Sequence, residues 1–154
     1  MKAIAVFDKK LKGIVNFEQI NNSVLVVGEI RGLKPNSFHG LHIHTYGDHT
    51  NNCMSAGGHF NPHNAIHGDR TDNKMNRHVG DLGNIKTNGW GIARFRFQDK
   101  IISLDFRKKS CIIGRSLIVH SHRDDLGRGP NKESLKTGNA GKRLDCCVIG
   151  IAKS

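Results

Sequence analysis

Hydrophobic and polar residues alternate along much of this chain, and a repeat of two residues is the pattern of a β-strand with one buried face. Short apolar or alternating runs are separated by turn residues such as Asn, Gly and Pro. We predict eight strands from these runs, at residues 2–7, 11–19, 24–30, 38–44, 81–87, 91–98, 112–120 and 146–152. Their number and spacing favour an all-β sandwich or barrel.

Two long polar segments, residues 47–80 and 121–145, interrupt the series of predicted strands. A segment of this length without an apolar run is usually either functional or disordered in a compact domain. Motifs such as GGHFNPH at residues 57–63 distinguish the first segment from a low-complexity linker. We therefore interpret it as an ordered loop, held by a metal ion and a disulfide.

The 154 residues suit one domain with one core, and we assign residues 1–154 to it. No apolar run is long enough to span a membrane, and the N-terminal apolar stretch is too short for a secretory signal, so we expect a cytoplasmic protein, in the host cytoplasm if the source is a virus. The net charge of +11 predicts attraction to anions. Stacking aromatics do not accompany the basic residues, which argues against a single-strand nucleic-acid platform. We expect neither nucleic acid nor a membrane as partner.

The strand predicted at residues 38–44 carries histidines at alternate positions. His42 and His44 should leave one face, while Leu41 and Ile43 leave the other and pack in the core. The chain has ten histidines, and candidate metal ligands follow along it, namely His42, His44, His59, His67, His78, Asp81 and His120. Imidazole suits both zinc and copper, and a carboxylate completes a zinc site. This set is enough for two ions if one imidazole is shared, which spacing alone does not decide.

Five sequence blocks carry a family resemblance: GLHIH at 40–44, NCMSAGGHFNP at 52–62, RHVGDLGN at 77–84, CIIGR at 111–115 and KTGNAG at 136–141. In these blocks and over nearly its whole length, the chain resembles the copper–zinc superoxide dismutases of the intracellular type. The resemblance implies a flattened eight-stranded Greek-key β-barrel, an immunoglobulin-like sandwich, with two long functional loops. It also implies an antioxidant enzyme that converts two superoxide anions and two protons to O2 and H2O2.

The resemblance also implies the ligands of one copper ion and one zinc ion per subunit. The copper ligands would be His42, His44, His59 and His120, and the zinc ligands His59, His67, His78 and Asp81. His59 would be a bridging imidazolate, copper would alternate between Cu(II) and Cu(I), and zinc would have no redox role. The segment between His67 and His78 is longer than usual in the family, so the shape of this loop stays open.

Three further residues match positions around the family's metal site. Asp124 resembles the carboxylate that joins a copper histidine to a zinc histidine and fixes both rings. Arg143 resembles the catalytic arginine that guides the anion, since a guanidinium keeps its charge and offers several donors. Thr137 would line the channel with it. Because the segment 121–145 is basic, we expect activity to fall more steeply with salt here than in acidic relatives.

The family match also implies a disulfide between Cys53 and Cys146. Neighbouring residues in a strand point to opposite faces, so only one of Cys146 and Cys147 should face Cys53. We expect Cys111 and Cys147 to be free thiols. His122 is an extra histidine close to His120 that could bind adventitious metal.

The resemblance implies a homodimer with an apolar contact at residues 113–114 and 148–151. A copper chaperone is a candidate partner for metal loading, and the sequence leaves open whether one is needed. Two other classes of function compete with the enzyme. A non-catalytic metal-binding relative would have lost copper ligands or the guiding arginine, whereas this chain keeps all of them. A basic nucleic-acid-binding barrel would have no need of clustered histidines.

Overall fold

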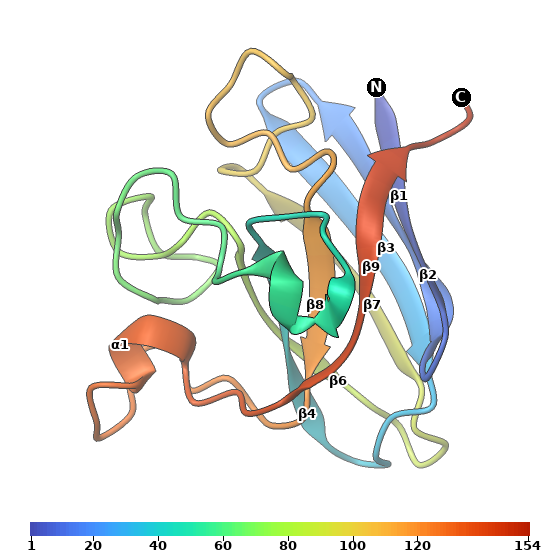
Figure 1. Ribbon diagram of the computed structural model, residues 1–154, viewed down its shortest axis with the longest axis vertical. Coiled ribbons are helices and arrows are strands. Elements are labelled where there is room, and N and C mark those ends of the chain that lie inside the picture. The colour runs from blue at the N-terminus through green and yellow to red at the C-terminus, as the bar shows by residue number, and fades with distance from the viewer.

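The computed structural model describes residues 1–154 as nine strands and two short helices (Figure 1). The strands are β1 (Lys2–Asp8), β2 (Lys12–Ile20), β3 (Ser23–Arg31), β4 (Phe38–His44), β5 (Thr50–Cys53), β6 (Asp81–Lys86), β7 (Ala93–Asp99), β8 (Ser116–His120) and β9 (Arg143–Ile151). The helices are the 3-10 turn η1 (Met54–Ala56) and the single α-helical turn α1 (Ser134–Thr137). Neither helix has the length or the apolar composition needed to span a membrane.

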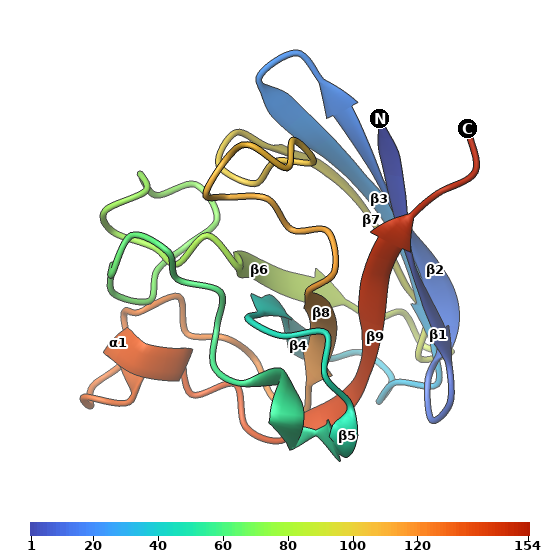
Figure 2. The same ribbon diagram turned by 45° about the horizontal axis from the view of Figure 1, so that its top comes forward.

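Eight of the strands form one antiparallel sheet in the order β6-β4-β8-β9-β1-β2-β3-β7. The sheet curls on itself, and an isolated bridge between Thr87 and Ala93 joins its two ends next to β6 and β7 (Figure 2). The chain passes from β3 to β4 across the sheet and returns with β7 to pair with β3, which is a Greek-key connection. The prediction of an all-β, eight-stranded barrel is confirmed.

The core of the barrel is one cluster of 24 buried side chains. In β3 the burial alternates residue by residue, with Val24, Val26 and Ile30 fully buried, because successive side chains of a strand point to opposite faces. Leu41 and Ile43 of β4 belong to the same cluster, as the sequence pattern predicts. Their burial fixes the opposite direction for the histidines of that strand.

The two largest corrections to the predicted strand bounds concern the last two strands, and the structure adds three short elements. The strand expected at residues 112–120 starts only at Ser116, because Gly114 takes a positive φ of 82° and the Arg115 N–H donates to the Ile112 carbonyl in a turn. The last strand starts at Arg143, three residues before the predicted residue 146. β5, η1 and α1 are too short and too polar for a hydrophobic period to show in the sequence.

The two long polar segments lie on one side of the barrel, next to β4 and β8 (Figure 1). The His67 N–H donates to the Leu135 carbonyl at 2.9 Å and ties the two loops together, and the Gly40 N–H donates to the His122 carbonyl at 2.9 Å and ties the second loop to β4. The loops are therefore ordered over the outer face of β4, where the histidines project.

Candidate metal centre

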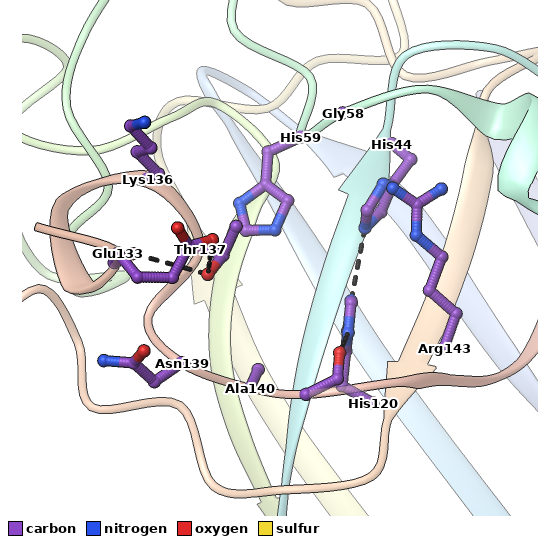
Figure 3. A pocket seen from close by; sticks show the side chains of 11 residues that line it. His44, Gly58, His59, His120, Glu133, Lys136, Thr137, Asn139, Ala140 and Arg143 are labelled. Atoms are coloured by element: carbon purple, nitrogen blue, oxygen red, sulfur yellow. Dashed lines mark hydrogen bonds between the residues drawn. The ribbon is translucent and has the colours of Figure 1, made fainter.

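The outer face of β4 presents His42 and His44, and both are buried although they lie outside the barrel core. β4 pairs with β8, which ends at His120, so a third imidazole reaches the same face from the neighbouring strand. His59 arrives from the first long loop, where an isolated bridge pairs it with His44. Figure 3 shows His44, His59 and His120 pointing toward one another.

The ligand nitrogens of His42, His44, His59 and His120 all lie within 4.8 Å of one another. His44 Nε2 is 3.2 Å from His120 Nε2. In His44 and His120, a backbone carbonyl holds the other ring nitrogen. His44 Nδ1 donates to the Gly57 carbonyl at 2.8 Å, and His120 Nδ1 donates to that of residue 141 at 3.2 Å. These bonds turn both Nε2 atoms inward, which is how histidine ligands of a metal are usually oriented.

A second cluster forms around the carboxylate of Asp81. Its Oδ1 lies 3.0 Å from His59 Nδ1, 3.0 Å from His67 Nδ1 and 3.1 Å from His78 Nδ1. Its Oδ2 accepts backbone N–H bonds from Gly68 at 3.0 Å and from His78 at 2.8 Å, which fix the carboxylate. Three imidazole nitrogens and one carboxylate oxygen form a donor set that suits tetrahedral zinc.

His59 takes part in both clusters. Its Nδ1 faces Asp81, and its ring centre lies 4.1 Å from that of His42 in the first cluster and 5.1 Å from that of His78 in the second. The structure thus brings together all seven candidate ligands, with one imidazole between the two groups. This is the arrangement that spacing in the sequence leaves undecided.

The Asp124 carboxylate joins the two clusters, since it bonds to one histidine of each. Its Oδ2 accepts a hydrogen bond from His42 Nε2 and its Oδ1 accepts one from His67 Nε2, both at 2.7 Å. The remaining nitrogens, His42 Nδ1 and His67 Nδ1, are buried and make no hydrogen bond, although His67 Nδ1 lies 3.0 Å from the Asp81 carboxylate. An unpaired buried polar atom costs about 1–3 kcal/mol, so a pair of them facing a histidine cluster calls for an ion that accepts their lone pairs. The residues present therefore fit a metal in each cluster.

The protonation states suit metal binding. Burial lowers the pKa of His42 and His44 well below the ordinary value, and it lowers the pKa of His120 to about 4. Burial alone would raise the pKa of Asp81, but its hydrogen bonds to His59 and the other imidazoles hold that pKa far below its usual range. Neutral imidazoles and an ionised carboxylate are the forms that bind metals.

We expect the metal-free protein to lose stability in mild acid because of His120. The unfolded chain takes up this proton near pH 6.5, whereas the folded chain takes it up only near pH 4. The unfolded state binds more protons between these values, so the free energy of unfolding falls as the pH falls through this window, by about 3 kcal/mol for this group.

Urea titrations of the metal-free protein at several pH values between about 7 and 4 measure this loss. His67 does not offset it, since its contacts with the Asp124 and Asp81 carboxylates outweigh burial and raise its pKa to about 9. Its stabilisation is complete below about pH 6.5 and is lost only as the pH rises through about 9. A free energy of unfolding that stays level from neutral pH to about pH 4.5 would contradict the prediction.

A pocket of about 390 Å³ leads to the first cluster, and we call it the entrance pocket. His44, His59 and His120 lie at its base, and Thr137 and Arg143 are among the residues that line it (Figure 3). The half-buried Arg143 donates from its guanidinium to the Cys53 carbonyl at 2.8 Å, which holds the cation beside His44. Most residues that line the pocket are polar or charged, and the Arg143 cation among them suits an anion.

The disulfide between Cys53 and Cys146 is present, with a Cα–Cα distance of 5.7 Å, and it ties β5 to β9. Cys111 and Cys147 are free thiols, as predicted. Cys147 points into the barrel core and Cys146 packs outside it, which is the opposite orientation expected of neighbours in a strand. His122 is exposed and lies outside both histidine clusters.

Sequence reasoning missed two residues that hold the site in place. The Arg77 side chain is fully buried, pairs with Asp99 at 2.7 Å and donates to the carbonyls of residues 70, 78 and 79, so it anchors the loop that carries His78. The side-chain amide of Asn84 donates to the Asp124 carbonyl at 2.9 Å and accepts the Asp124 N–H at 2.7 Å, so it holds the Asp124 backbone on both sides. Arg77 and Asn84 both stand in the block 77–84, but a polar residue in a loop or strand gives no signal of such a role.

Comparison with known proteins places these clusters in a known family. The family model described as copper/zinc superoxide dismutase matches residues 11–149. The protein named superoxide dismutase [Cu-Zn] from Paramecium bursaria Chlorella virus 1 is 52% identical over 153 residues, covering 99% of this chain and 80% of that protein. Superoxide dismutase [Cu-Zn] A from Xenopus laevis is 52% identical over 154 residues, covering 98% of each. The crystal structure of the clock protein EA4 superposes with a TM-score of 0.92 at 42% identity, covering 98% of this chain and 94% of that one.

Proposed function

This chain belongs to the copper/zinc superoxide dismutase family, and we propose that its two histidine clusters carry out the family's reaction with one copper and one zinc ion per subunit. The enzyme converts two superoxide anions and two protons to O2 and H2O2. The observation that carries the assignment of ions is that His42 Nδ1 and His67 Nδ1, one in each cluster, are buried without a hydrogen bond while a single carboxylate fixes both rings.

The donor sets divide between the two ions by their chemistry. We assign copper to His42, His44, His59 and His120, which offer nitrogen alone, and zinc to His59, His67, His78 and Asp81, which include a carboxylate. When bound, copper supplies one-electron exchange with superoxide, and zinc supplies positive charge without redox chemistry. The protein's part is to fix the rings, to admit the anion and to supply a proton.

Arg143 receives the substrate in this proposal. Its guanidinium keeps its charge at every relevant pH and presents planar donors to an anion, and its bond to the Cys53 carbonyl fixes its position at the entrance pocket. Thr137 lines the same pocket, with its hydroxyl held by Glu133 at 3.0 Å. The proton for the second half-reaction is held at Nε2 of His59, because its Nδ1 faces Asp81.

A superoxide-consumption assay on metal-loaded protein, with copper and zinc measured on the same sample, tests this proposal. We expect His44→Ala to lose copper and activity together, whereas His122→Ala keeps both, since His122 lies outside the clusters. Full copper and zinc content without dismutation would overturn the proposal and favour a non-catalytic metal-binding role.

The rate should fall with ionic strength, because superoxide dismutases are themselves a standard example of electrostatic steering. The chain carries a net charge of +11, and Lys136 lines the entrance pocket. We expect kcat/KM to fall about threefold between low and physiological salt, as the Debye length shrinks from about 30 Å to about 8 Å.

Stopped-flow rates of two charge reversals show where the steering field acts. Lys136→Glu should lower kcat/KM and flatten its salt dependence, whereas Lys108→Glu, with the same change in net charge but on a surface away from the pocket, should do so much less. A salt profile that is flat in the unmodified enzyme would contradict electrostatic steering here.

We also propose a homodimer through the apolar residues at 113–114 and 148–151. Val148 and Ile151 are 41% and 64% exposed, whereas Ile149 between them is buried in the core. Exposed apolar side chains on the outer surface of a barrel are candidates for an interface. Light scattering at micromolar concentration should give twice the mass of the chain, and Ile151→Glu should shift it toward the monomer. A monomer mass for the unmodified protein would refute the dimer.

A copper chaperone and a cytoplasmic location complete the proposal, and both rest on likeness to intracellular members of the family. If the source is a virus, the compartment is the host cytoplasm. Copper content of the protein purified from cells with and without a functional copper chaperone tests the loading route. Equal copper content in both would remove the chaperone from the proposal.

A further inference from the structure

A second cavity, of about 820 Å³, adjoins the entrance pocket and shares Gly141 and Arg143 with it. It is lined by residues 9–10, 52–54 and 141–146, and we call it the basic groove. Figure 2 shows the β1–β2 turn, β5 and the start of β9 at the same end of the barrel. A cavity of this volume is in the size range of small-molecule sites, about 300–1,000 Å³.

The lining of the basic groove is partly apolar. It includes the disulfide between Cys53 and Cys146, the half-buried Leu144 and the exposed side chain of Met54. Asp145 also lines the groove, but it is only 4% exposed, and its two oxygens accept backbone N–H bonds at 2.9 and 2.8 Å. Its carboxylate is thus engaged within the protein and fixes the wall of the groove.

The remaining charged residues of the groove are all cations. Lys9, Lys10 and Lys142 are exposed, and Arg143 is half-buried. None of these four side chains takes part in an ion pair. Four unpaired cations around apolar surface complement a ligand that has negative charge at one end and an apolar body at the other.

We propose that the basic groove binds a small organic anion with an apolar body, and that this ligand lowers superoxide capture at the entrance pocket. The coupling runs through Arg143, which lines both cavities and is held between them by the Cys53 carbonyl. A negative charge in the groove offsets the positive field of that guanidinium and repels a second anion. The effect on capture rests on the proposed function, whereas binding itself does not.

Calorimetric titration of the metal-loaded protein tests the binding with three probes. 1-Naphthyl phosphate has both charge and an apolar body, inorganic phosphate has only the charge, and 1-naphthol has only the body. We expect the naphthyl phosphate to bind about tenfold more tightly than either of the others. Equal affinity for inorganic phosphate, equal affinity for 1-naphthol, or no binding of naphthyl phosphate would each overturn the proposal.

A matched pair of double variants locates the site. Lys9→Glu with Lys10→Glu should weaken naphthyl phosphate about tenfold, whereas Lys108→Glu with Lys109→Glu, which makes the same change in net charge away from the groove, should leave its affinity within about twofold. Equal weakening in both variants would show only a general effect of net charge and would overturn the site. Thermal unfolding of both variants checks that each is folded.

The activity of the unmodified enzyme then tests the coupling. Saturating naphthyl phosphate should lower kcat/KM for superoxide at least about twofold more than sodium chloride of equal ionic strength does. Binding without this excess loss would overturn the regulatory role. Absence of activity before any probe is added would instead count against the proposed function, so the two failures are distinguishable.

Discussion

Replacing Cys146 by serine should lower the free energy of unfolding of the oxidised protein by about 4–5 kcal/mol. The disulfide joins residues 93 positions apart, so it removes much of the chain entropy of the unfolded state. It also holds the segment whose Cys53 carbonyl accepts the hydrogen bond from Arg143. We therefore expect kcat/KM to fall even under conditions in which the variant is still folded and metal-loaded.

Cys147 should not replace the lost partner. Its side chain packs in the barrel core with Ile149 and Leu117, on the opposite face of β9 from Cys53. Burial, together with nearby carboxylates, raises the pKa of its thiol well above the ordinary value, so the reactive thiolate is scarce. Cys147→Ala is the matched control, and it should cost only about 1 kcal/mol, since it removes one small buried atom group and no cross-link.

Urea titrations of both variants and of the unmodified protein, each metal-free, measure the difference between them. A loss in Cys146→Ser no greater than that in Cys147→Ala would contradict the prediction. Such a result would mean that the unfolded chain is already compact enough for the cross-link to restrict little.

The sequence was sufficient for the barrel and for the identities of the clustered histidines, and β4 shows why. An alternation of Leu41 and Ile43 with His42 and His44 determines which side chains enter the core, so the direction of the histidines follows from local pattern alone. The burial of those same histidines could not be read in this way. The burial of these histidines depends on the two long loops that cover them, and the loops have no hydrophobic periodicity from which their path could be predicted.

Other parts of the site depend on contacts between residues distant in the sequence. The pairing of His67 with Leu135 across the two loops, and the bracket that Asn84 forms around Asp124, are set by the final fold and not by spacing. Arg77 is the clearest case, because an arginine in a polar loop is ordinarily exposed, and here it is among the most buried side chains of the chain. Its partner Asp99 stands at the end of β7, and it meets Arg77 only once the chain has folded.

Asp124→Asn should lower zinc affinity about 10–100-fold and copper affinity less. The aspartate accepts one hydrogen bond from His42 and one from His67, both at 2.7 Å, whereas an asparagine has one acceptor oxygen and places an NH2 donor against the second ring. One imidazole must then rotate or change its tautomer. His42 is fixed within β4, but His67 lies in a loop outside any strand or helix, so its ring is the one expected to move.

Competition with a zinc chelator, followed by metal analysis, measures the change. Asp125→Asn is the matched control, since this neighbouring carboxylate bonds to Ser134 and Asn139 and to no histidine. It should keep zinc affinity within about twofold, because no imidazole depends on it. Equal zinc affinity in Asp124→Asn and the unmodified protein would show that Asp81 and the backbone bond of His67 suffice to hold that ring. The carboxylate between the two clusters would then have no positioning role at the zinc ligand His67.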